Sequence, residues 1–262
     1  MSTILYDIKN GVGQITLNRP AQLNAFNEEM HLELRRVLED ARDNPKVRAI
    51  LLTGAGKGFC AGQDLSERAP GAEARDLGET LTNFYNPLIR QMEALEKPKL
   101  AVVNGAAAGA GIGVALACDI VLAADTAKFA IAFGKIGLIP DAGLTWRLVQ
   151  LLGLARAKAF VLTQGVWSAE QARDYGLVWE IHEAAVLQER AQALATRLAY
   201  GAATGNALSI RALNAATGNT LEEQLLLEVA CQREAGFSAE YREGVSAFLE
   251  KREAVFFQQE ID

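Results

Sequence analysis

Short apolar segments that alternate with longer helical ones constrain the fold of this chain more than any other feature. Residues 49–53, 100–103 and 120–124 have the length and composition of buried strands, whereas residues 80–96 and 111–118 are predicted to be helices. Strands that alternate with helices are typical of a largely parallel sheet layered with helices. The sequence therefore predicts an α/β fold.

The N-terminal part predicts a hairpin followed by a helix. Residues 4–9 and 14–17 flank the segment Asn10-Gly11-Val12-Gly13, which is typical of a tight turn between antiparallel strands. Asn27 is expected to cap the next helix, because two glutamates follow it and apolar residues then recur at helical spacing.

Two later segments depart from the alternation of strands and helices. Residues 66–79 are charged and contain Pro70, which predicts a mobile loop rather than a linker between domains. After Trp146 the pattern is almost wholly helical, and Ser168 is expected to open a capping box that Gln171 closes. We therefore expect one main domain with a helical tail.

Composition and charge exclude several classes of function. The chain has 262 residues, of which 50% are hydrophobic and 22% charged, as in globular proteins. A net charge of −6 without a basic stripe argues against nucleic-acid binding by phosphate neutralisation. The most apolar region, residues 100–124, is interrupted by Asn104, Asp119 and several glycines, so no membrane span is predicted.

Cysteine and histidine usage predicts neither disulfides nor a metal site. Cys60, Cys118 and Cys231 are odd in number and lie in apolar runs, which suits core residues of a cytoplasmic protein. His31 and His182 lack metal-ligand spacing and are interpreted as structural or solvated residues. No metal or redox cofactor is expected.

Two glycine-rich segments resemble nucleotide-binding motifs. The GAGKG sequence at residues 54–58 lacks the glycine spacing of a P-loop and the Ser or Thr that would follow its lysine, so a P-loop is rejected. The GAGIG sequence at residues 109–113 could begin a dinucleotide site, with Asp125 on a ribose. It lacks the G-x-G-x-x-G spacing, so this signal is weak.

A third motif combines two loops. Residues 59–65 follow one predicted strand and residues 104–113 follow another. If the two strands are neighbours, backbone N–H groups at their ends can converge on one carbonyl oxygen. The sequence therefore predicts an oxyanion hole.

Several longer segments resemble a known family. LNRPAQLNAFN, GAGKGFCAGQDL, NGAAAGAGIGVALACDI, GLIPDAG and SAFLEKR stand in the order and spacing of the crotonase (enoyl-CoA hydratase/isomerase) superfamily, over nearly the whole chain. Within it, NFYNPLIRQM, FGKIGLIPD and YREGVSAFLEKR are most similar to isomerases of ring-1,2-epoxyphenylacetyl-CoA in phenylacetate catabolism. The resemblance implies a spiral core of ββα units at residues 1–195 and a helical region at residues 196–262 that supports trimerisation and covers the active site.

The resemblance also assigns the catalytic groups. The oxyanion N–H groups belong to Gln63 and Ala110. Hydratases of the family carry two glutamates, at positions that are Gly113 and Phe133 here, so an addition of water by two acids is not expected. Asp141 stands where family isomerases and dehalogenases of aromatic acyl-CoA compounds carry a carboxylate.

An apolar wall is expected to make Asp141 a better base. Phe133, Ile139 and Trp146 should desolvate its carboxylate and raise its pKa. A purely structural interpretation is that Asp141 caps the helix that starts near Thr145 or forms a turn.

We expect an acyl-CoA isomerase in which Asp141 performs a 1,3-proton shift that converts the ring epoxide of phenylacetyl-CoA to the oxepin thioester. A Δ3,Δ2-enoyl-CoA isomerase with another acyl group stays open, because Leu144 stands where relatives favour glycine. So does an aromatic acyl-CoA dehalogenase or hydrolase, in which the aspartate is a nucleophile. The last possibility is a catalytically weak binding subunit of a hydratase complex.

The substrate brings its own coenzyme A, so no separate cofactor is expected. By resemblance, the substrate and CoA contact Gln22, Asn24, Ala61, Gly62, Asp64, Leu65, Gly109, Gly111, Phe133, Phe248 and Lys251. Phe248 and Lys251 match positions that the family often supplies from a neighbouring subunit. Family members form trimers that commonly pair into hexamers, and we expect one of these states here.

Overall fold

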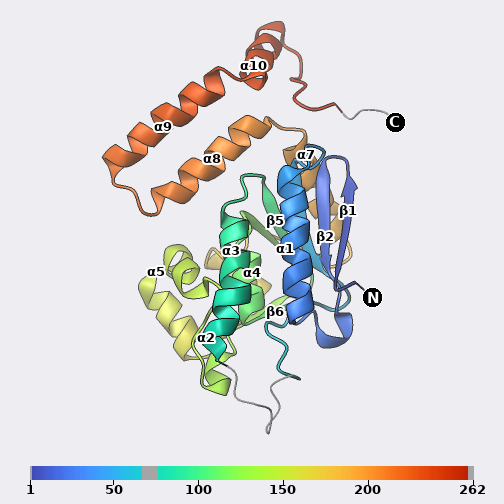
Figure 1. Ribbon diagram of the computed structural model, residues 1–262, viewed down its shortest axis with the longest axis vertical. Coiled ribbons are helices and arrows are strands. Elements are labelled where there is room, and N and C mark those ends of the chain that lie inside the picture. Colours follow the sequence, from blue (N-terminus) through green and yellow to red (C-terminus); the bar gives the residue numbers. More distant parts are fainter. Residues whose placement is uncertain (1, 67–75, 259–262) are drawn as a thin grey trace.

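The computed structural model describes residues 2–66 and 76–258, whose strands form two sheets (Figure 1). In the larger sheet β1 and β2 are antiparallel and all other neighbours are parallel. Its strands, in spatial order, are β1 (Ile4–Lys9), β2 (Val12–Leu17), β3 (Ala49–Gly54), β5 (Lys99–Val103), β7 (Ile120–Ala124) and β10 (Glu180–His182). The predicted α/β fold and the N-terminal hairpin are confirmed.

The smaller sheet explains how the chain spirals. It has the order β4 (Gly58–Cys60), β6 (Ala106–Ala108), β8 (Lys128–Ala130) and β9 (Val166–Ser168). β3, β5 and β7 of the larger sheet are followed in the chain by β4, β6 and β8, and each pair leads into a helical segment. This repeated unit is the ββα spiral that the family resemblance implied. Its second strands span three residues each, which is too short for a periodic sequence pattern.

Helices cover both sheets and form the C-terminal region. Asn27 caps α1 as predicted, since its side-chain oxygen accepts the N–H of Met30 at 3.0 Å, and the capping box of Ser168 and Gln171 opens α6. Short 3-10 helices lie at Pro20–Gln22 and Phe133–Ile136. The α-helices are α1 (Glu28–Asp43), α2 (Leu77–Thr80), α3 (Asn86–Glu93), α4 (Ala110–Leu116), α5 (Leu144–Leu162), α6 (Ala169–Asp174), α7 (Leu187–Ala199), α8 (Ala203–Ala216), α9 (Leu221–Gly236) and α10 (Ala239–Glu250).

The helix predicted at residues 80–96 is divided into three parts. α2 is followed by a π-helical turn at Leu81–Tyr85 and then by α3. Pro87, near the start of α3, has no N–H to donate, so a regular α-helix cannot run through this point. The predicted loop at 66–79 was wrong at its end, where Asp76 caps α2 by accepting the N–H of Gly78 at 2.7 Å. The rest of that loop, residues 67–75, lies outside the described residues.

The C-terminal helices differ in how they contact the sheets. The buried residues of α7, Leu187, Ala191, Ala195 and Ala199, recur every four positions and form the face that packs on the larger sheet. α8, α9 and α10 extend away from the body of the molecule (Figure 1). The predicted boundary after residue 195 therefore falls inside α7, and the division into two regions stays a prediction.

The three cysteines are free thiols with buried side chains. Cys60 and Cys118 belong to the hydrophobic core as expected, whereas Cys231 is buried on α9, outside that core. Within residues 2–66 and 76–258, no helix has the length and apolar character needed to cross a membrane.

His31 lies on α1 inside an aromatic cluster and is 1% exposed. The centre of its ring is 4.3 Å from that of Tyr85 and 4.6 Å from that of Phe26. Neither ring nitrogen has a hydrogen-bond partner in the described part of the chain. Burial, aided by the positive charge of Arg35, lowers the pKa of His31 to about 3.

We expect the free energy of unfolding to fall as the pH is lowered from 7 to 5. The unfolded chain gains a proton at His31 near the ordinary pKa of ~6.5, whereas the folded chain stays neutral there. Stabilisation is therefore complete above that pKa and is lost at lower pH, by about 2 kcal/mol at pH 5. Urea denaturation of the wild type, His31→Phe and the control His182→Gln measures this loss. Unchanged pH dependence in His31→Phe would contradict the assignment.

Candidate active site

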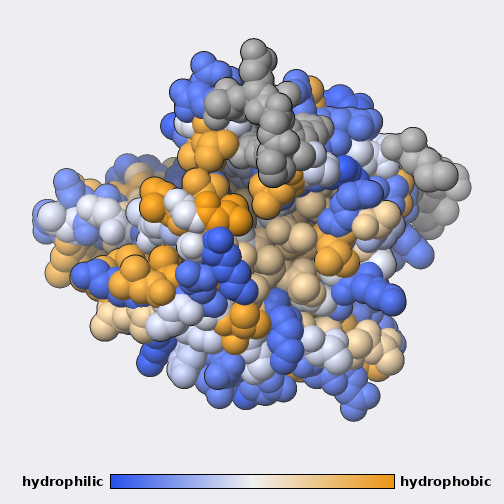
Figure 2. Space-filling model, turned by 90° about the horizontal axis from the view of Figure 1, so that it is seen from below, coloured by the Kyte–Doolittle hydropathy of each residue, from blue (hydrophilic) through white to orange (hydrophobic). Residues whose placement is uncertain are grey.

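A cavity of about 250 Å³ lies between loops that follow the strands and the helical segment α2 to α3. Its lining is mostly apolar, and Asp141 is the only carboxylate among the described lining residues. Figure 2 views the molecule from the end where α2 lies in Figure 1, and apolar residues gather in the central part of this face. The sequence predicted nine of the lining residues: Ala61, Gly62, Gln63, Leu65, Gly109, Ala110, Phe133, Ile139 and Asp141.

The backbone N–H groups of Gln63 and Ala110 are available to a ligand in this cavity. The backbone N–H of Phe26 donates to the backbone oxygen of Gly62 at 2.7 Å, and the backbone oxygen of Phe26 accepts the N–H of Asp64 at 2.9 Å. Since extended backbone alternates in direction, the N–H of Gln63 points away from Phe26. Ala110 is the first residue of α4, so its N–H has no acceptor within the helix. Neither group has an acceptor in residues 2–66 or 76–258.

Two glycines allow the loops to approach closely. Gly62 has a φ of +91°, and a Cβ there would lie 2.9 Å from the oxygen of Ala108 and 3.3 Å from the nitrogen of Ala110. A Cβ on Gly111 would lie only 2.4 Å from the oxygen of Cys60. The strand end after β4 and the start of α4 are therefore in backbone contact, as the predicted oxyanion hole requires.

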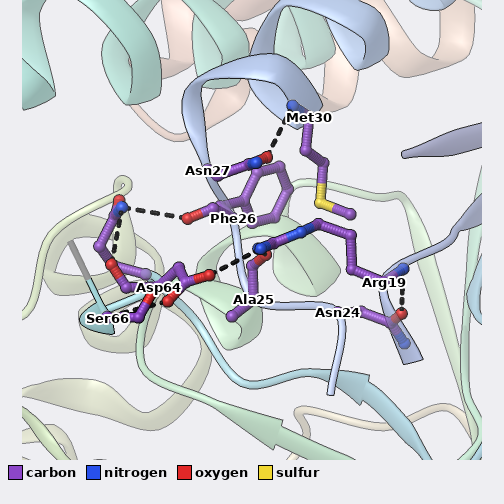
Figure 3. A network of polar contacts seen from close by, with 9 residues as sticks. Arg19, Asn24, Ala25, Phe26, Asn27, Met30, Asp64 and Ser66 are labelled. Carbon is purple, nitrogen blue, oxygen red and sulfur yellow. Dashed lines mark hydrogen bonds and ion pairs between the residues drawn. The ribbon is translucent and has the colours of Figure 1, made fainter. Parts of the chain in front are cut away.

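A buried ion pair holds the loop that carries Gln63 (Figure 3). Asp64 lies 2.7 Å from the guanidinium of Arg19 and accepts the N–H of Ser66 at 2.9 Å. Burial alone would raise the pKa of Asp64, but its hydrogen bonds with Ser66 and the Arg19 charge hold it below its usual range. The side chain of Gln63 donates to the oxygen of Phe26 at 3.0 Å. These contacts tie the loop to the start of α1.

We expect Arg19→Met to destabilise the protein by about 1–3 kcal/mol, because Asp64 would be left as a buried acceptor without its cation. The effect should weaken below the ordinary pKa of 3.8, because the stability contributed by the lowered pKa of Asp64 is lost as the pH falls through its folded-state value. Thermal denaturation at pH 7 and at pH 3 measures the destabilisation and its weakening. Arg42→Met is the matched control, because Arg42 and Asp43 pair on the surface. Equal effects of the two substitutions would contradict this role for Asp64.

Asp141 lies in the turn between the 3-10 helix at Phe133–Ile136 and α5. α5 begins at Leu144 with Gly143 at the cap position, so Asp141 is not its N-cap. The backbone oxygen of Asp141 accepts the N–H of Leu144 at 2.9 Å, which makes the expected turn. This bond uses the main chain, and the residue also lines the cavity. A structural role in the turn and a chemical role in the cavity are therefore compatible.

The expected wall around Asp141 is present in part. Phe133 and Ile139 line the cavity. Trp146 does not, and that expectation was wrong: it lies on α5 with 49% of its surface exposed, beside the guanidinium of Arg147. The wall also includes Leu81 and Tyr85 of the π-helical turn, which the sequence did not predict. A π-helical turn has no sequence period of its own, so Pro87 was the only residue that could have indicated an irregular helix here.

Six predicted contact residues do not line the cavity. Asn24 is fully buried, and its side chain donates to the oxygens of Ala55 and Gly58 and accepts the N–H of Arg19. It can therefore shape the loop but not touch a ligand. Phe248 is 82% exposed on α10, and Lys251 follows it; α10 lies at the far end of the molecule from α2 (Figure 1). The remaining three are Gln22, Asp64 and Gly111.

Neither a dinucleotide site nor a metal site is supported by the residues around the cavity. Asp125, expected on a ribose in a dinucleotide site, is exposed after β7 and does not line the cavity. No group of three or more His, Cys, Asp or Glu side chains in the described ranges could hold a metal ion.

Comparisons with known proteins identify the family of this chain. The profile of the family described as enoyl-CoA hydratase/isomerase matches residues 7–259. The 1,2-epoxyphenylacetyl-CoA isomerase of Escherichia coli K12 is 50% identical, with 98% of each chain covered. The 2,3-dehydroadipyl-CoA hydratase of the same strain is 34% identical, with 96% of this chain and 97% of that protein covered.

Solved structures lead to the same family. An enoyl-CoA hydratase from Bacillus anthracis superposes with a TM-score of 0.92 at 32% identity and covers 97% of this chain and 98% of its own. An enoyl-CoA hydratase/isomerase from Cupriavidus metallidurans CH34 gives 0.91 at 34% identity, with 99% and 98% covered. Family profile, sequence relatives and fold thus coincide over the length of the chain, and the protein belongs to the enoyl-CoA hydratase/isomerase family of enzymes.

Proposed function

We propose that this protein is an acyl-CoA isomerase with a single base, Asp141, and an oxyanion hole formed by the N–H groups of Gln63 and Ala110. One observation supports the proposal: the three residues line one apolar cavity, in which Asp141 is the only carboxylate among the described lining residues. Gly113 and Phe133 offer no second acid. This donor and acceptor set suits proton transfer beside a thioester rather than the addition of water.

The proposed reaction is a 1,3-proton shift. The two N–H groups bind the thioester oxygen and stabilise the negative charge that develops on it when the α-proton leaves. Asp141 takes that proton and returns it to the carbon two positions away, so the double bond moves and the aspartate is regenerated. Leu81 and Phe133 line the cavity and exclude water, which strengthens the interactions with the developing charge.

The substrate we propose is the ring epoxide of phenylacetyl-CoA, which interconverts with an oxepin. The proton shift acts on this oxepin form and gives the conjugated oxepin thioester. The name of the relative from Escherichia coli that is 50% identical over 98% of the chain supports this choice. The apolar lining, which includes Tyr85 and Phe133, suits a ring without charge. The same base could also convert a 3-enoyl-CoA to the conjugated 2-enoyl-CoA.

The test is turnover of two substrates by the purified protein. We expect isomerisation of a 3-enoyl-CoA in D₂O with deuterium incorporated during turnover, and conversion of enzymatically generated epoxide to the oxepin thioester. Isomerisation of the first substrate alone would assign the site to aliphatic enoyl-CoA. No turnover of either would contradict the proposal and favour a dehalogenase or a binding subunit. A nucleophilic Asp141 would also need a group that activates water, and no histidine lies among the described lining residues.

We also propose a homotrimer or hexamer in the cytoplasm. Large apolar side chains are exposed on α9, on α10 and between them, among them Leu221 (76%), Phe237 (79%) and Phe248 (82%), more than a surface in water commonly carries together. A neighbouring copy would cover them and bring Phe248 and Lys251 to a site. Light scattering after gel filtration distinguishes a monomer from either oligomer. A hydratase partner, which belongs to the alternative of a binding subunit, is tested by co-purification with the hydratases of the same cell.

A further inference from the structure

The turn that carries Asp141 packs against α4 where that helix has no side chain. A Cβ added to Gly113 would lie 2.7 Å from the backbone oxygen of Ala142 and 2.9 Å from its Cβ. Real Cβ atoms do not approach other atoms so closely, so any other residue at 113 must separate the helix from the turn. Ala142 directly follows Asp141 in the chain. A displacement at Ala142 is therefore a displacement of the base.

The turn is held on its other side as well. The methyl carbon Cγ2 of Ile89, on α3, lies 3.3 Å from the position of a Cβ on Gly143. Ala142 is 3% exposed and Leu144 is fully buried. Ala142 also adopts a φ of +51°, a left-handed conformation that non-glycine residues hold only where their surroundings enforce it. The turn thus contacts α4 through Ala142 and α3 through Gly143.

These contacts indicate why a residue without a side chain stands at position 113. Resting on the proposed function, we propose that Gly113 is a positioning residue, which lets the Asp141 turn pack on α4 and so fixes the base relative to the oxyanion hole. α4 begins with Ala110, whose N–H would bind the thioester oxygen, and Gly113 lies one turn further along the same helix. A single rigid element therefore sets the distance between the group that activates the α-proton and the group that takes it.

Gly113→Ala tests this role. A methyl group that moves Asp141 by about 1 Å should lower kcat for 3-enoyl-CoA isomerisation on the order of 100-fold. The Kd for a saturated acyl-CoA should stay within about threefold of the wild-type value, because the oxyanion N–H groups do not move. Alanine is a better helix former than glycine, so without the contact at Ala142 the substitution would leave kcat intact and raise the melting temperature. Gly236→Ala, where an added Cβ meets nothing within 4 Å, is the matched control.

Two further measurements separate positioning from a general loss of structure. In Gly113→Ala/Ala142→Gly the contact between the two Cβ atoms is removed and the left-handed residue becomes glycine, so part of the lost kcat should return. This double variant also provides the measurement if the single variant does not fold. Crystal structures of wild type and Gly113→Ala should show the Asp141 turn displaced while Gln63 and Ala110 stay in place.

The outcomes distinguish this proposal from the function on which it rests. Wild-type kcat in Gly113→Ala, an unmoved turn, or a double variant no better than the single one would each overturn the role of Gly113. If the wild type does not isomerise the 3-enoyl-CoA, the proposed function fails. The two crystal structures would then still decide whether residue 113 sets the position of Asp141.

Discussion

Asp141→Asn is expected to lower kcat for isomerisation of a 3-enoyl-CoA by about 10²- to 10⁴-fold, the contribution of a positioned general base. The amide keeps the shape of the carboxylate but cannot take a proton. No other carboxylate among the described residues lines the cavity, so none can replace it there. Exchange of the α-proton with D₂O should fall by a similar factor, because the same group removes that proton.

Binding should separate this loss from a damaged fold. The Kd for a saturated acyl-CoA should be nearly unchanged in Asp141→Asn, since the N–H groups of Gln63 and Ala110 belong to other segments of the chain. The matched control is Asp125→Asn, an exposed aspartate outside the cavity, whose kcat should equal that of the wild type. Exchange that survives in Asp141→Asn would place the base elsewhere. Equal losses in both variants would indicate a structural effect.

The sequence predicted those helices and strands whose apolar residues recur at a regular spacing. The strands β1, β2, β3, β5 and β7 of the larger sheet and the helix α1 follow apolar patterns long enough to recognise, and Asn27 and Ser168 signal their helices through local capping chemistry. The three-residue strands β4, β6 and β8 carry no such pattern. They were implied only by the family resemblance, since their pairing depends on contacts far apart in the sequence.

The sequence predicted which backbone segments form the candidate site, but it did not predict how the side chains around the site pack. The loops that carry Gln63 and Ala110 were expected to converge if the strands before them are neighbours, and β3 and β5 do pair and the loops are in contact. Asn24 was expected to contact the ligand, but its side-chain amide makes three hydrogen bonds to the backbone of Arg19, Ala55 and Gly58. Trp146 was expected in the apolar wall around Asp141, but it lies in the first turn of α5 with 49% of its surface exposed. Distance along the chain does not determine which face of a helix a residue takes.

Gly111→Ala is expected to lower kcat/KM by about 10²- to 10³-fold, the effect of losing an oxyanion-hole donor. The added Cβ would lie 2.4 Å from the oxygen of Cys60 and 2.8 Å from its Cβ, and the oxygen belongs to the backbone, so α4 must move away from β4. That movement withdraws the N–H of Ala110 from the N–H of Gln63. Asp141 would stay in the cavity, but the two N–H groups could no longer bind the thioester oxygen together.

The pattern of losses should differ from that of Asp141→Asn. With the oxyanion hole opened, binding of a saturated acyl-CoA should weaken along with turnover, because the carbonyl is bound in both the ground state and the transition state. Gly236→Ala in α9 controls for the substitution itself, and circular dichroism gives the folded fraction by which each rate is divided. A Gly111→Ala variant with wild-type kcat/KM would show that the approach of α4 to β4 is not what binds the oxygen. Since α4 also contacts the Asp141 turn through Gly113, the two glycine variants together test whether this one helix aligns both halves of the site.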